Sequence, residues 1–223
     1  FNNVEVNVYE VLLRMFDSMG NMVSPALFIP IAEQHSLAAE LDKWVIAMSL
    51  QNMALSKTKD HYCINLSGQT LADQSMVSYV KQKIEQFGVS PEQVTFEITE
   101  TFAITHLEAA IYVIGEITKY GCKFALDDFG SGLSSFSYLQ KLPVQKLKID
   151  GVFIKDITKN PRNQVFVSTM VTLAKSMEME TVAEFVETEE EFTMLKELNI
   201  DFCQGYFFHK PARWVVSESV EVD

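Results

Sequence analysis

The chain is poor in the residues and runs that mark several common classes of protein. It has three cysteines in 223 residues, Cys63, Cys122 and Cys203, and no CxxC pair. An odd number of scattered cysteines in apolar, strand-like contexts predicts buried thiols in a reducing compartment, not a disulfide framework. No signal peptide opens the sequence, and no apolar run is long enough to cross a bilayer. We therefore expect a cytoplasmic location and no direct membrane contact by this fragment.

Positive charge is also scarce. Eighteen Lys and Arg stand against 30 Asp and Glu, which gives a net charge of −12. Phosphate backbones and anionic membranes select Lys- and Arg-rich faces, so this balance argues against binding of duplex nucleic acid or of lipid over a broad surface. A small phosphate-bearing ligand held by metal ions remains compatible with it.

Several enzyme motifs are missing as well. The sequence has no GxGxxG or GxxxxGK[ST] phosphate loop, no GxSxG nucleophile motif and no HxxxH metal-ligand pair. These absences argue against a nucleotide-binding doubly wound sheet, a serine hydrolase and a histidine-based metal site. The four histidines are interpreted as structural or surface residues.

What the sequence does contain is a regular alternation of strand-like and helix-like segments. Nearly continuous apolar strands, repeating at roughly thirty-residue steps, predict a parallel sheet with crossover helices. Helices are expected over residues 25–54, 73–87, 107–120, 162–177 and 189–198. Strands are expected over residues 4–15, 62–66, 94–99, 123–129, 146–150, 181–186 and 201–208.

Seven strands are one fewer than a (β/α)8 barrel needs, and that fold usually has about 250 residues. We predict the α/β class and a TIM-type (β/α)8 barrel whose N-terminal strand is missing from this fragment, which begins at Phe1 and not at Met. An open doubly wound sheet is the second choice. Residues 1–223 are expected to form a single domain excised from a larger protein.

Polar residues, most of them acidic, lie at or near the ends of almost every apolar run. They are Glu10, Asn65, Glu97, Asp127, Asp128, Lys148 and Glu184. In a barrel the C-terminal ends of the strands form the active face, so we expect these side chains to converge. Converging carboxylates repel one another unless cations hold them. The pattern predicts a divalent-metal enzyme that acts on a phosphate ester.

Taken singly, each of these residues has a structural alternative. Adjacent Asp127 and Asp128 could share two cations if the backbone turns at Gly130-Ser131-Gly132, or they could belong to a solvated turn. Glu97 lies inside an apolar strand, where a cation, a proton or a salt bridge must compensate its charge. Lys148 could polarise a water or neutralise a developing oxyanion, or it could simply pair with an acid.

Eight short motifs occur in order over residues 9–211. Tyr9-Glu10-Val11-Leu12-Leu13-Arg14 resembles the signature of the EAL domain family of bacterial cyclic di-GMP phosphodiesterases, with Val11 giving EVL in place of EAL. The other segments similar to family motifs are FIPIAE (28–33), NLS (65–67), EITE (97–100), DDFGSG (127–132), KID (148–150), AEFVE (183–187) and QGY (204–206).

The resemblance implies an eight-stranded barrel whose first strand runs antiparallel to the others. It also implies hydrolysis of cyclic di-GMP to linear pGpG with two Mg²⁺ or Mn²⁺ ions in each active site. By motif, one metal would be held by Glu10, Asn65, Glu97 and Asp127. Asp127 and Asp128 would hold the second metal.

The resemblance assigns the remaining candidates supporting tasks. Glu184 and Gln204 would bind ligands of the second metal or nearby waters, and Lys148 would contact the attacking water. Glu100 would hold the loop that orders Asp128.

The set of substrate-binding candidates consists of Arg14, Asp150 and Glu187. Arg14 would contact a phosphate of the substrate. Glu187 would support Lys148 or the substrate pocket.

Two departures from the family pattern stand out. Phe185 occupies a place where many members have glycine; its bulky side chain could alter the pocket or pack into the barrel, and we expect it to pack into the barrel. A YQPI-like strand, usual upstream in the family, is not visible before Phe1. The resemblance also implies a homodimer formed around residues 134–139. Fusion to GGDEF, PAS or sensor modules of a multidomain signalling protein is implied too, and it leaves room for a tether to the inner membrane.

Two other functions compete with the active phosphodiesterase. One is a catalytically silent cyclic di-GMP receptor, a binding module that signals through its conformation. The other is a purely structural interaction domain, which the retained acids disfavour. Detection of pGpG after incubation with cyclic di-GMP and Mg²⁺ separates the three.

Overall fold

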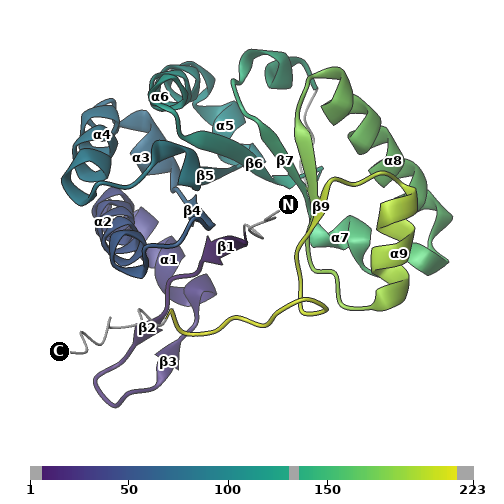
Figure 1. The fold of residues 1–223 in the computed structure, drawn as a ribbon, viewed down its shortest axis with the longest axis horizontal. Helices are drawn as coiled ribbons and strands as arrows, with labels where there is room; N and C mark the ends of the chain where they lie inside the picture. The colour runs from purple at the N-terminus through teal and green to yellow at the C-terminus, as the bar shows by residue number, and fades with distance from the viewer. Residues whose placement is uncertain (1–6, 131–135, 215–223) are drawn as a thin grey trace. The chain divides into compact units, whose positions relative to one another are not determined.

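The computed structural model describes residues 7–130 and 136–214 (Figure 1). Within these residues, seven strands form one sheet in the order β1-β4-β5-β6-β7-β8-β9, and β2 and β3 form a separate pair. The count of seven agrees with the number predicted from the apolar runs. The chain divides into two compact units: the first holds residues 1–96, 108–123 and 213–223, and the second holds residues 97–107 and 124–212.

In the first unit, β1 (Val8–Val11) pairs in parallel with β4 (His61–Asn65), and Glu10 lies opposite Cys63. The unit also contains the antiparallel pair of β2 (Met15–Phe16) and β3 (Met22–Val23) and the start of β5 (Val94–Thr99). Its helices are α1 (Pro25–Gln34), α2 (Ala38–Ser56), α3 (Gly68–Ala72), α4 (Ser75–Phe87), η1 (Pro91–Gln93) and most of α6 (Leu107–Tyr120).

Three predictions for the first unit need correction. The strand predicted over residues 4–15 ends at Val11, because the chain turns into the β2-β3 hairpin, and residues 4–6 of that prediction lie outside the described residues. The single helix predicted over residues 25–54 is two helices, because Ser36 has a φ of 59°, which interrupts the helical backbone. The helix predicted over residues 73–87 begins at Ser75; Gln74 is its N-cap, and Asp73 Oδ1 accepts the Ser75 N–H at 2.9 Å.

The second unit continues the alternation. Its strands are the end of β5, β6 (Lys123–Phe129), β7 (Lys146–Ile149), β8 (Glu180–Ala183) and β9 (Phe202–Cys203). Its helices are α5 (Glu100–Thr105), η2 (Phe136–Lys141), α7 (Gly151–Ile154), η3 (Ile157–Lys159), α8 (Pro161–Ser176) and α9 (Glu189–Glu197).

Local signals in the sequence explain where the helices of the second unit begin. The Asn160 side chain accepts the N–H groups of Arg162 and Asn163 and so caps α8, which has Pro161 at its first position. Thr188 and Glu191 form a reciprocal capping box at the start of α9. The strands contribute fully buried apolar side chains to the core, including Phe124, Leu126, Leu147, Ile149 and Ala183.

Strand direction supports a parallel α/β fold. The pairs β1-β4, β6-β7, β7-β8 and β8-β9 are all parallel, so the antiparallel strand implied by the resemblance is not one of these strands. The predicted Gly-Ser-Gly turn after Phe129 and the start of the predicted dimer segment fall at Ser131, Gly132 and Ser134, outside the described residues. Among the described helices, none combines the length and hydrophobicity needed to cross a membrane.

Candidate functional site

A buried lysine surrounded by three carboxylates lies at the centre of the second unit's polar residues. The Lys148 Nζ atom is 2.6 Å from Glu97 Oε2 and 2.8 Å from Glu184 Oε1. Asp127 Oδ1 lies 3.1 Å from the same ammonium. The side chains of Lys148 and Glu97 are each only 2% exposed. These four residues are called the Lys148 cluster below.

Each member of the Lys148 cluster comes from a different strand or strand end. Glu97 lies in β5, Asp127 in β6 and Lys148 in β7. Glu184 follows Ala183, the last residue of β8. Where two strands run parallel, their C-terminal ends lie at the same edge, which is why residues far apart in the sequence meet here. The structure therefore brings together four of the residues singled out by the sequence pattern.

A bulge in β6 allows two adjacent acids to serve one site. Successive strand residues normally point to opposite faces. The β6-β7 register runs from Leu126 opposite Leu147 to Phe129 opposite Ile149, so β6 has one residue more than β7 over this stretch. Asp128 has a φ of 54°, and its N–H donates to Asp127 Oδ1 at 3.0 Å. The sequence predicted a backbone turn at the glycines after the acids, but the turn begins at Asp128 itself.

The charges in the Lys148 cluster do not balance. One ammonium faces three carboxylates, and burial makes every uncompensated charge costly. Burial raises the pKa of Glu184 to about 8; the Lys148 charge opposes this shift, whereas the charges of Asp127 and Glu97 add to it. The cluster therefore gains from additional positive charge or from a proton on Glu184.

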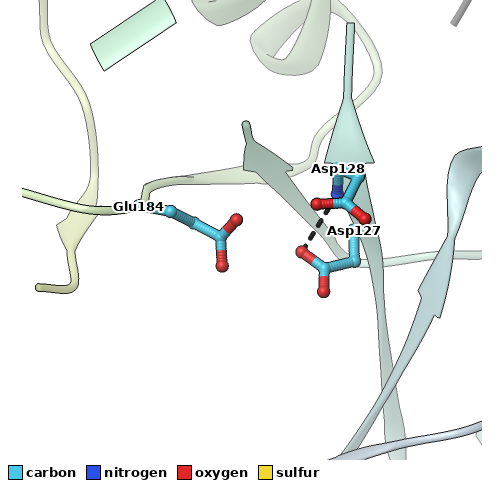
Figure 2. A group of neighbouring side chains, drawn as sticks. All are labelled: Asp127, Asp128 and Glu184. Carbon is cyan, nitrogen blue, oxygen red and sulfur yellow. Dashed lines mark hydrogen bonds between the residues drawn. The ribbon is translucent and has the colours of Figure 1, made fainter. Parts of the chain in front are cut away.

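Asp127, Asp128 and Glu184 also form the one group of acidic side chains, within the described residues, whose ligand atoms are close enough to hold a metal ion. One oxygen from each lies within 4.8 Å of the others. Figure 2 shows Glu184 reaching from the loop after β8 toward the two aspartates of β6. An all-oxygen donor set suits a hard divalent cation such as Mg²⁺ or Mn²⁺. The side chains present therefore fit such an ion.

Glu100 has the position expected of a residue that orders the loop after β6. Its Oε2 accepts the Gly130 N–H at 3.0 Å, and its Oε1 accepts the Tyr138 hydroxyl at 2.8 Å. Glu100 is only 3% exposed, so these hydrogen bonds compensate a buried carboxylate. Burial raises the pKa of Tyr138, which keeps its hydroxyl a donor. Tyr138 was missed in the sequence because nothing in its local pattern distinguishes it from an ordinary core aromatic.

In the first unit, two predicted ligands contact each other. The Asn65 Nδ2 atom donates to Glu10 Oε1 at 2.8 Å, between the ends of β4 and β1. Asn65 is exposed and Glu10 is half-buried. Arg14, the predicted phosphate contact, is exposed, and its guanidinium donates to the Leu13 carbonyl at 2.9 Å.

The remaining predicted residues have identifiable structural contacts. Asp150 is the N-cap of α7, and its Oδ1 accepts the Val152 N–H at 2.9 Å. Glu187 is exposed, and its N–H donates to Glu191 Oε2 at 2.9 Å. The Gln204 N–H donates to the Ala183 carbonyl at 2.8 Å, which places Gln204 beside the end of β8.

The prediction for Phe185 is wrong. Its side chain does not pack into the core but is 66% exposed. β8 ends at Ala183, and Phe185 has a φ of 55°, so the residue no longer alternates as it would in a strand. Its ring lies against Gly151, where an added Cβ would be 2.4 Å from Phe185 Cδ2.

Similarity to known proteins agrees with the site geometry. The family model described as the EAL domain matches residues 1–211. The chain is 40% identical over 205 residues to cyclic di-GMP phosphodiesterase PdeB of Shewanella oneidensis, covering 91% of this chain and 24% of that protein. It is 35% identical over 206 residues to cyclic di-GMP phosphodiesterase PdeF of Escherichia coli, covering 91% and 28%. The chain thus spans about a quarter of the length of these relatives.

Solved structures share the fold. PaMucR phosphodiesterase in complex with c-di-GMP aligns with a TM-score of 0.84 at 29% identity, covering 91% of this chain and 83% of that one. The FimX EAL domain from Pseudomonas aeruginosa bound to c-di-GMP aligns with a TM-score of 0.86 at 27% identity, covering 93% and 85%. This likeness confirms the predicted α/β barrel class.

Proposed function

The chain belongs to the EAL domain family, and from that premise we propose that it hydrolyses cyclic di-GMP to linear pGpG with two divalent metal ions. The observation that carries the proposal is the Lys148 cluster, in which three carboxylates with side chains 2–13% exposed surround a single ammonium. Such an excess of buried negative charge is costly in a structural core but suits a site that binds cations. Cyclic di-GMP is proposed as the substrate because these relatives are named cyclic di-GMP phosphodiesterases.

Bound metal ions would be held by the acids of this site. Glu97, Asp127, Asp128 and Glu184 are the proposed ligands from the second unit, with Gln204 supporting them. Glu10 and Asn65, from the first unit, are proposed as ligands on the strength of the family motif. When bound, two divalent ions supply activation of a water molecule and neutralisation of charge on the attacking and leaving oxygens.

Lys148 acts in this proposal as a fixed positive charge. The three surrounding carboxylates favour the charged form of the amine, so Lys148 serves as a hydrogen-bond donor and not as a general base. It holds Glu97, Asp127 and Glu184 in one geometry and stabilises negative charge that develops on phosphate oxygens. A preorganised donor in a buried site acts in this way without reorganisation cost during the reaction.

Other residues position the site or the substrate. Glu100 fixes the backbone after Asp128 through the Gly130 N–H. Arg14 is proposed to bind a substrate phosphate, and Glu187 to support the substrate pocket. Asp150 is proposed to contact substrate in addition to capping α7.

A catalytically silent receptor is the second candidate, because the solved neighbours include an EAL domain bound to c-di-GMP. The test is to incubate the purified chain with cyclic di-GMP and Mg²⁺ and to separate the products by chromatography. Formation of pGpG that stops on chelation supports the phosphodiesterase. Binding without product supports the receptor, and neither binding nor product contradicts both.

Matched variants make this test specific. Glu97→Gln removes one charge from the Lys148 cluster, and Glu92→Gln removes one charge from η1 in the first unit. The proposal requires that the first change abolish pGpG formation and that the second leave it intact.

The assembly of the whole protein is proposed from the resemblance alone. It comprises a homodimer and fused GGDEF, PAS or sensor modules, in a cytoplasmic protein with or without a tether to the inner membrane. Sedimentation that shows only monomer at high concentration would contradict the dimer.

A further inference from the structure

An exposed aromatic ring stands directly beside the proposed metal ligand Glu184. Phe185 follows it in the chain, so their Cα atoms are about 3.8 Å apart. The Phe185 side chain is 66% exposed, whereas Glu184 is 7% exposed. A positive φ is uncommon for a bulky residue, and Phe185 has a φ of 55°. Neither the exposure nor the backbone conformation is explained by packing in the core.

The backbone directly after Phe185 is held by two hydrogen bonds of Val186. The Val186 N–H donates to the Gln204 carbonyl, and the Phe207 N–H donates to the Val186 carbonyl, each at 3.0 Å. Gly205 lets these segments approach, because an added Cβ there would be 2.2 Å from the Val186 oxygen. The ring is therefore carried by a loop of defined conformation.

The position of the ring is also defined. It rests against Gly151, whose missing side chain leaves the space that Phe185 Cδ2 occupies. Gly151 begins α7, with the cap residue Asp150 between it and the end of β7, and lies three residues beyond Lys148. Phe185 thus presents a planar apolar face at the C-terminal ends of β7 and β8, the edge where the Lys148 cluster lies.

We propose that Phe185 is a substrate-contacting residue that stacks on a guanine base of the dinucleotide. This inference rests on the proposed function. The acids of the site can accept hydrogen bonds from the edge of a base, but they offer no stacking surface to its face. An uncharged ring fixed in place offers a stacking surface, and base–aromatic stacking is a substantial part of single-stranded nucleotide binding.

The test compares four substitutions of Phe185 in the full chain. Tyr and Trp keep a planar ring, Leu keeps apolar cover over Gly151 without a π face, and Gly relieves the positive φ. For Leu and Gly we expect KM for cyclic di-GMP to rise about tenfold, with kcat nearly unchanged. For Tyr and Trp we expect KM within about twofold of wild type. The control Tyr112→Leu removes an aromatic ring, 48% exposed, on α6 in the first unit and should leave KM unchanged.

Binding is measured beside turnover, with labelled cyclic di-GMP and Mg²⁺ at low temperature, so that this inference and the proposed function can fail separately. If wild type forms pGpG and the Leu variant has the same KM, the stacking role is overturned and the phosphodiesterase stands. If wild type binds without turnover and the Leu variant binds about tenfold more weakly, the stacking role stands and the phosphodiesterase fails. If wild type neither binds nor hydrolyses cyclic di-GMP, both are overturned. Equal losses in the Leu, Tyr and Trp variants would also overturn stacking, because they would indicate a packing role.

Discussion

Polar residues lie at the ends of parallel strands in both units, but they are compensated differently. In the second unit, Lys148 and Glu97 are each 2% exposed, and the Lys148 ammonium contacts three carboxylates. In the first unit, Asn65 is exposed and donates a single hydrogen bond to half-buried Glu10. The sequence context is similar in both units, because each polar residue ends an apolar run.

The difference shows that burial decides whether such a polar residue needs a partner within the protein. A carboxylate removed from water requires a partner, so the Lys148 cluster is a network whose members depend on one another. If the hydrogen bond between Asn65 and Glu10 breaks, water can bond to both side chains, so the loss costs little free energy.

The first unit also contains a buried acid whose carboxylate is compensated by hydrogen bonds and not by a cation. Asp42 is 9% exposed, and its Oδ2 accepts the Ser67 N–H at 2.7 Å and the Thr70 hydroxyl at 2.5 Å. Burial raises its pKa, and these hydrogen bonds oppose the shift. Asp42 fastens α3 to α2 and has a structural task, so burial of an acid alone does not identify a functional site. The additional sign in the second unit is that several acids converge.

The largest expected effect is on turnover. Replacing Lys148 with Met should lower kcat for cyclic di-GMP about a thousandfold, because a preorganised donor is lost and three carboxylates lose their shared cation. The matched control is Lys146→Met on the same strand, which breaks the 3.7 Å pair with Glu180 and the 4.7 Å cation–π contact with the Phe202 ring. Steady-state kinetics on variants shown to be folded by circular dichroism make the comparison. Unchanged turnover in the Lys148 variant would rule out a catalytic role.

Metal binding should stabilise the chain measurably. At Mg²⁺ concentrations 100-fold above Kd, binding adds about 2.7 kcal/mol to the free energy of unfolding. For a chain of this size, that raises Tm by roughly 5–10 °C. Asp127→Asn should reduce the shift, whereas Glu180→Gln, at the opposite end of β8 from Glu184, should not. Calorimetric scans with and without Mg²⁺ would contradict the proposed site if both variants responded equally.

The stability of the metal-free chain should depend on pH through Glu184. Its pKa rises from 4.5 to about 8 on folding, so between these values the folded chain keeps a proton that the unfolded chain releases. The free energy of unfolding should therefore fall as pH rises from 4.5 through about 8. Glu184→Gln should lose this contribution. Denaturant titrations of both proteins in EDTA measure it, and identical pH slopes would contradict the assignment to Glu184.

The sequence predicted the parallel strands and the convergence of acids because both depend on periodicity and position, which are local. Glu97, Asp127, Lys148 and Glu184 each follow or interrupt an apolar run, and parallel pairing brings them together. The helix of residues 25–54 was predicted wrongly as one piece, since no strong breaker residue marks the left-handed conformation of Ser36.

What the sequence could not predict depends on contacts between distant segments. Thr181 to Val186 is an almost continuous apolar run and indicates a strand, but β8 stops at Ala183. The backbone of Val186 is held by Gln204 and Phe207, and the space for the Phe185 ring is made by Gly151. Asp150 was predicted only as a substrate contact, because the four-residue helix that it caps is too short to show a periodic pattern.

The smallest expected effect on stability is that of a substitution at Asn65, in the first unit, and it tests the contrast between the two units most directly. Asn65→Ala removes the 2.8 Å hydrogen bond to Glu10 at an exposed site, so the free energy of unfolding of the metal-free chain should fall by only about 0.5–1 kcal/mol. If Asn65 is also a metal ligand, the same variant should bind Mg²⁺ more weakly and turn over cyclic di-GMP more slowly. Asn52→Ala, a half-buried position on α2, serves as the matched control. A small loss of stability with full activity would assign Asn65 to local structure and confine the metal ligands to the other candidates.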